Sequence, residues 1–106
     1  HRFGDVLARL ASEAEAAGAM EDAIRLSRRG IELDPLREDT YREHIRRLIA
    51  AGEVAAARRA FDDLARRLRT ELQAPPSRET RRLLDAIPTP KRPAPQPDDL
   101  DGFEGL

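Results

Sequence analysis

The chain has 106 residues, of which 37% are charged and 4% are aromatic, and its 19 Lys+Arg nearly balance its 20 Asp+Glu. A net charge near zero argues against a free-standing nucleic-acid binder, which normally carries a basic excess. The lack of cysteine excludes disulfides, thiolate zinc sites and thiol nucleophiles. No apolar run reaches the ~18 residues that a membrane span needs. The length and composition therefore indicate one small helical domain.

Apolar residues recur at helical spacing through the first 87 residues, and no stretch alternates with the period of a β-strand. The first predicted helix covers 4–17, with Val6, Leu7, Leu10, Ala14 and Ala17 on one stripe, and Gly18 ends it. The second covers 20–33 and stops at Asp34-Pro35, because the residue before a proline is pushed out of the α region.

The third predicted helix covers 38–51 and ends at Gly52. The fourth and longest covers 53–72, and Pro75-Pro76 breaks the chain after it. Ser77 is a good N-cap for a fifth helix over 78–87. The inward positions on these three helices are Tyr41, Ile45, Leu48, Ile49, Val54, Ala57, Phe61, Leu64, Leu68, Leu72, Leu83, Leu84 and Ile87.

The helical region repeats itself. Gly18 and Gly52 lie 34 residues apart, and Ala23 pairs with Ala57 at the same spacing. A 34-residue helix–turn–helix period is that of the tetratricopeptide repeat. The expected fold is all-α, with antiparallel helix pairs stacked as a tetratricopeptide-like right-handed superhelix of about five helices. Each unit departs from the pattern. In the first, Ser27 stands where the second unit has Phe61, and Gly30 replaces the usual second alanine. In the second, His44 stands where the first unit has Leu10.

Residues 88–106 differ from the helical domain in their proline content and their acidic charge. Five prolines fall within 88–97, which predicts an extended spacer. Residues 88–106 hold two basic and four acidic residues, whereas 1–87 hold 17 basic and 16 acidic ones. We therefore expect a helical domain over 1–87, a Pro-rich linker over 88–97 and a short acidic–hydrophobic end over 98–106.

Three local patterns point to a narrower family. They are 32–38 (ELDPLRE) followed by YR at 41–42 and LIAAG at 48–52, then 57–66 (ARRAFDDLAR) followed by LRTEL at 68–72, and last 74–83 (APPSRETRRL). In this order and spacing they resemble the bacterial transcriptional activation domain, the helical module of antibiotic regulatory proteins. His44 and Ala74 depart from the family's usual residues.

The resemblance implies a module that follows a winged helix-turn-helix DNA-binding domain in a bacterial, cytoplasmic transcriptional regulator. Such a module acts through protein partners, namely its own DNA-binding domain, RNA polymerase or a second copy in a homodimer, and meets DNA only indirectly. The alternative is a generic tetratricopeptide-type scaffold that binds a peptide and has no role in transcription.

Two groups of residues are candidates for partner binding. The concave face between the first and third helices is one, where Arg37, Tyr41, His44 and Arg47 would line a peptide groove. The alternative for that face is ordinary interhelical packing. The second group is the arginine cluster of the fourth helix, made of Arg58, Arg59, Arg66 and Arg67 together with Arg69, which would touch DNA phosphate near a promoter or an acidic protein. Its alternative is a solvated face with local ion pairs such as Asp62–Arg66, and Glu43–Arg47 on the third helix fits the same pattern.

Little in the sequence suggests catalysis, a cofactor or a metal. His1 and His44 lack the neighbouring ligands that a metal site needs. Adjacent acids on a helix point about 100° apart and do not converge on one substrate. We therefore expect no enzyme activity. In the end segment, Leu100, Phe103 and Leu106 recur every third residue between acids, as in a short docking segment. The alternative is the start of a further domain.

Overall fold

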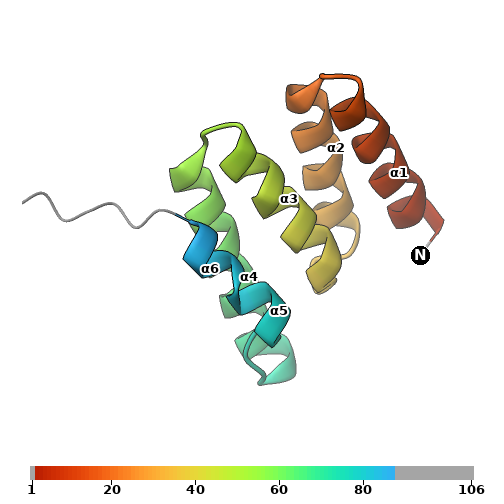
Figure 1. Cartoon of the computed structure of the whole chain (residues 1–106). Helices are drawn as coiled ribbons and strands as arrows, with labels where there is room; N and C mark the ends of the chain where they lie inside the picture. The colour runs from red at the N-terminus through yellow and green to blue at the C-terminus, as the bar shows by residue number, and fades with distance from the viewer. Residues whose placement is uncertain (1, 88–106) are drawn as a thin grey trace, which may run out of the picture.

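A computed structural model describes residues 2–87, and all of its regular elements are helices (Figure 1). They are α1 (Arg2–Ala16), α2 (Met20–Leu33), α3 (Glu38–Ala50), α4 (Val54–Leu72), α5 (Arg78–Arg81) and α6 (Leu83–Ala86). The predicted all-α class is confirmed. The predicted fifth helix is instead two four-residue helices, because a turn at Arg82 separates them.

The first four helices stack as two antiparallel pairs. In chain order, α1 packs against α2, α2 against α3, and α3 against α4, so each helix lies beside its sequence neighbours (Figure 1). The short helices α5 and α6 lie at the α3–α4 end of the stack, where α6 contacts α3. The stack is therefore covered at one end, and α1 forms the other end.

The two turns within the pairs have the same geometry. Gly18 has φ +83° and Gly52 has φ +79°, which are left-handed values that other residues rarely adopt. The hydrogen bonds also repeat, since the amide of Ala19 donates to the carbonyl of Ala14 and that of Glu53 donates to Leu48, both at 2.8 Å. The 34-residue repeat read from the sequence is thus a repeat of backbone structure.

The core lies where α2, α3 and α4 meet. Ala23 and Ala57 are completely buried, and as small residues they let the helices of each pair approach closely. The larger cluster consists of Ile24, Ile45, Leu48, Ala57, Phe61 and Ile87. A second cluster of Tyr41, Leu64 and Leu68 lies further along α3 and α4. The cluster residues of α3 and α4 match the predicted inward faces of these helices, except that Leu72 is exposed.

A polar junction fixes α5 to the start of α3. The Glu38 carboxylate accepts hydrogen bonds from the Ser77 amide at 2.9 Å and from the Thr80 hydroxyl at 2.7 Å. Burial raises the pKa of Glu38, but these hydrogen bonds and the charge of Arg42 lower it by more. The Ser77 hydroxyl also accepts from the Thr80 amide, which confirms the predicted N-cap.

Candidate protein-binding surfaces

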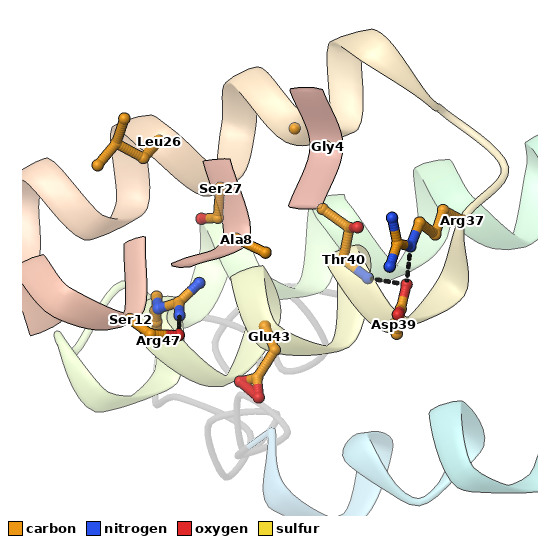
Figure 2. Close-up of a pocket in the computed structure, with 11 residues that line it drawn as sticks. Gly4, Ala8, Ser12, Leu26, Ser27, Arg37, Asp39, Thr40, Glu43 and Arg47 are labelled. Carbon is orange, nitrogen blue, oxygen red and sulfur yellow. Dashed lines mark hydrogen bonds and ion pairs between the residues drawn. The ribbon is translucent and has the colours of Figure 1, made fainter. Parts of the chain in front are cut away.

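A cavity of about 250 Å³ lies between α1, α2 and α3 (Figure 2). Helix α1 contributes small side chains, α2 contributes the middle of its buried face, and α3 and the loop before it contribute charged groups. The lining residues are Gly4, Ala8, Ser12, Leu26, Ser27, Gly30, Arg37, Asp39, Thr40, Glu43 and Arg47. This cavity occupies the place of the predicted peptide groove.

Ion pairs hold the Arg37 end of the groove. The Arg37 guanidinium donates to Asp39 at 2.8 Å and reaches Asp5 of α1 at 3.1 Å. These hydrogen bonds raise the pKa of Arg37. Burial raises the pKa of Asp39, but the hydrogen bonds from Arg37 and the Thr40 amide and the charges of Arg37 and Arg42 together lower it by more. Arg37 therefore lines the groove as predicted in position, but its charge is already balanced by two acids.

A second cluster, which we call the Glu15 clamp, joins α1 to α3 at the other end of the groove. Arg46 donates to both Glu15 carboxylate oxygens at 2.8 and 2.7 Å, and Arg47 Nε donates to Oε1 at 2.8 Å. These hydrogen bonds lower the pKa of Glu15 to about 2. Arg47 is only 2% exposed and pairs with Glu15 rather than with Glu43 as expected, because its side chain points across to α1.

Tyr41 and His44 do not line the groove. Tyr41 is 1% exposed, and its hydroxyl donates to Asp63 at 3.0 Å; burial and that carboxylate raise the pKa of Tyr41 to about 12. His44 is 5% exposed and lies 2.6 Å from the Ser27 hydroxyl. Burial, then the charges of Arg28 and Arg47, lower the pKa of His44 to about 4. Both side chains are enclosed by α2, α3 or α4 and are not exposed to a peptide.

Most of the predicted arginine cluster on α4 is paired within its own helix. Arg66 and Arg67 both contact Asp63, at 2.7 and 3.0 Å, and Arg58 lies 3.8 Å from Asp62. Arg66 therefore pairs with Asp63 and not with Asp62, which was the predicted partner. Arg59 has no ion pair among residues 2–87, and it borders a separate hollow between α2 and α4. The cluster is not one continuous basic ridge.

An exposed apolar stripe on α1 was not predicted. Phe3, Val6 and Leu10 are 69%, 39% and 40% exposed, whereas Ala11 is completely buried against the stack. Val6 and Leu10 were expected to face inward. At 100° per residue they lie on the opposite side of α1 from Ala8 and Ser12, which line the cavity. We call this stripe the α1 outer face. The hydrophobic pattern of α1 includes the residues of the α1 outer face. Their exposure follows from the position of α1 at the end of the stack.

Sites of other kinds find no support in the part of the chain that is described. Within residues 2–87, no group of three or more His, Asp or Glu side chains is placed to hold a metal ion. None of the helices in that range has the length and hydropathy that crossing a bilayer requires. His1 and the predicted tail residues Leu100, Phe103 and Leu106 lie outside the described residues, as do the linker 88–97 and the end 98–106.

The comparisons agree with the architecture. The family model of the bacterial transcriptional activator domain matches residues 2–88, which include the whole helical stack. This chain therefore belongs to the bacterial transcriptional activator domain family, a regulatory family and not an enzyme family. Comparison with curated proteins and with solved structures finds no match.

Proposed function

We propose that this domain is a protein–protein contact module of a bacterial transcriptional regulator, and that the α1 outer face is a contact surface. The observation that carries the proposal is the asymmetry of the stack. Helices α5 and α6 cover one end, while α1 leaves Val6 and Leu10 partly exposed at the other. Stacked helical repeats need a cover on each terminal unit, because a single unit cannot bury its own apolar surface.

The chemistry of the α1 outer face favours a protein partner. Full burial of a Val, Leu or Phe side chain contributes roughly 1.5–3 kcal/mol relative to exposure. Val6 and Leu10 on one helix face would supply part of a modest protein interface. The partners that suit a regulator of this family are its own DNA-binding domain, RNA polymerase or a second copy. DNA would be met only through the DNA-binding domain, in the cytoplasm.

The test is retention of partners from a lysate of the source cell on the full chain, followed by mass spectrometry. The wild-type chain is compared with a Val6→Glu/Leu10→Glu variant. A matched control, Leu33→Glu/Leu72→Glu, places the same charges on exposed leucines elsewhere. We expect polymerase subunits or a DNA-binding regulator on the wild type and the control, and their loss on the α1 variant. Sedimentation of the three proteins reports self-association through the same face.

Equal retention by all three proteins would contradict a role for the α1 outer face. The alternative function, a generic tetratricopeptide-type scaffold, is favoured by the cavity between α1 and α3. Against it, Arg37 and Arg47 in that cavity already have acidic partners. Ala8→Trp would fill the cavity, and if it alone removed unrelated peptides from the retained set, the scaffold function would replace our proposal.

A further inference from the structure

A second hollow, of about 570 Å³, lies between α2 and α4 and takes no part in the proposal above. Its apolar lining comes from Ile24, Leu48 and Ala56. Its charged lining comes from both helices, with Glu21, Arg25 and Arg28 on the α2 side and Glu53 and Arg59 on the α4 side. We call it the α2–α4 hollow.

Two arginines in this hollow differ from most others in the stack. Arg25 pairs with Asp22 of its own helix. Arg28 and Arg59 form no ion pair with any residue in the range 2–87, although acids satisfy most arginines of α3 and α4. Two uncompensated guanidiniums beside apolar side chains suit a ligand that carries carboxylates and apolar groups together.

The end of this chain has that chemistry. Residues 98–106 contain four acids and no basic residue, and Leu100, Phe103 and Leu106 recur between them. The order of charge along the chain also matches the hollow. The basic pair Lys91 and Arg92 comes first, and the hollow's acids, Glu21 and Glu53, lie at the starts of α2 and α4. The acidic residues of 98–106 follow this basic pair in the sequence. In the same order, Arg28 and Arg59 follow Glu21 and Glu53 along α2 and α4.

The described part of the chain ends in the core cluster that borders the hollow. Ile87, the last described residue, is 2% exposed and belongs to the same buried cluster as Ile24 and Leu48, which line the hollow. The eleven residues from Pro88 to Asp98 include the five closely spaced prolines. An extended proline-rich segment of that length spans roughly 34 Å, at about 3.1 Å per residue. This reach exceeds the ~30 Å length of a 20-residue helix.

We propose that the acidic–hydrophobic segment 98–106 binds in the α2–α4 hollow of its own chain, with its carboxylates on Arg28 and Arg59 and its apolar residues against Ile24 and Leu48. A short tether gives such a segment an effective concentration of about millimolar order. The segment therefore occupies the hollow ahead of acidic partners in solution. A partner that binds there must first displace it.

Paramagnetic relaxation in the full chain tests this proposal. The chain has no cysteine, so Gly105→Cys carries a nitroxide at a single site. We expect the amide signals of Ile24, Arg28, Ala56 and Arg59 to lose intensity and to recover when the nitroxide is reduced. The Arg28→Glu/Arg59→Glu variant should lose this effect. Adding Asp98→Arg/Asp101→Arg to that variant should restore it.

The matched control is Arg69→Glu/Arg81→Glu, which reverses two exposed arginines outside the hollow and should keep the effect. Dispersed amide signals in each variant establish that it is folded. No intensity loss in the wild type, or equal loss in both charge-reversed proteins, would overturn the proposal. In a mixed sample, one molecule carries the nitroxide and another carries the isotope label. If intensity is lost only in that sample, the hollow binds the tail of a second copy, and binding within one chain is overturned.

Discussion

Ser27 Oγ and His44 Nδ1 lie 2.6 Å apart where α2 meets α3, and this contact joins two positions that depart from the repeat. Ser27 occupies the position that Phe61 takes in the second unit, and the smaller side chain leaves room for an imidazole from α3. The Ser27 hydroxyl also lies 3.0 Å from the Ile24 carbonyl oxygen. Since a hydroxyl has one proton, donation to Ile24 favours the His44 tautomer that carries its proton on Nδ1. The two departures therefore compensate each other.

Ser27→Ala should destabilise the domain by about 1–3 kcal/mol, because it leaves a buried imidazole nitrogen without a partner. Urea unfolding at pH 7 measures the change in the free energy of unfolding. In a His44→Leu background the same substitution should cost less than half as much, since no nitrogen is then left unsatisfied. Equal costs in the two backgrounds would show that the residues are not coupled.

Stability should fall as the pH is lowered from about 6.5 to 4. The folded-state pKa of His44 is about 4, below the ordinary value of 6.5, because burial and then the charges of Arg28 and Arg47 disfavour the imidazolium. The unfolded chain therefore binds more protons in this window. The contribution of neutral His44 is fully present above pH 6.5 and is lost toward pH 4, with a slope of at most ~1.4 kcal/mol per pH unit.

Urea unfolding at several pH values between 4.5 and 7 measures this dependence. The carboxylates with lowered pKa, such as Glu15 and Asp63, contribute stability that is lost at lower pH. For Glu15 the window runs from about 4.5 down to about 2. His44→Leu should therefore flatten the profile above pH 4.5. A profile unchanged by that substitution would contradict the assignment to His44.

Glu15→Gln should cost about 1.5–3 kcal/mol in the free energy of unfolding, as for hydrogen bonds to charged groups. Arg47 is almost fully buried and would lose its charged partner, and the cluster would lose the hydrogen bond to the carboxylate oxygen that the amide NH2 replaces. Asp62→Asn is the matched control, because its pair with Arg58 is exposed and its atoms are 3.8 Å apart. The control should change stability by less than ~1 kcal/mol. Similar losses in the two variants would mean that the Glu15 clamp does not stabilise the α1–α3 contact.

The sequence was sufficient to predict the first four helices, since each is amphipathic and is ended by a glycine, a proline or a turn. It predicted α2 to the residue, over Met20–Leu33. It did not predict the break at Arg82, because the apolar residues Leu83, Leu84 and Ile87 fit one continuous helix as well as two short ones. The spacing of apolar residues shows which of them share a helix face. It does not show where a single turn interrupts the helix.

The candidate surfaces were less predictable, because they depend on contacts between helices. Arg47 fits a pair with Glu43 four residues earlier, and only the packing of α1 against the stack brings Glu15 within 2.8 Å. Likewise, Val6 and Leu10 read as core residues until the neighbours of α1 are known. The Ser27–His44 contact was visible in the sequence only as two separate departures from the repeat.

Gly30 and Thr40 provide a further test of the α2–α3 contact. Gly30 is buried within α2, and a Cβ added there would lie 3.2 Å from the Thr40 Cγ2 atom. Replacing a glycine in a helix by alanine gains up to ~1 kcal/mol from helix propensity, but the close contact offsets that gain. In a Thr40→Ser background, which lacks Cγ2, Gly30→Ala should raise the free energy of unfolding by about 0.5–1 kcal/mol. In the wild type the gain should be smaller or negative. Urea unfolding of the four proteins measures the difference, and equal effects in both backgrounds would mean that Thr40 does not set the glycine requirement at position 30.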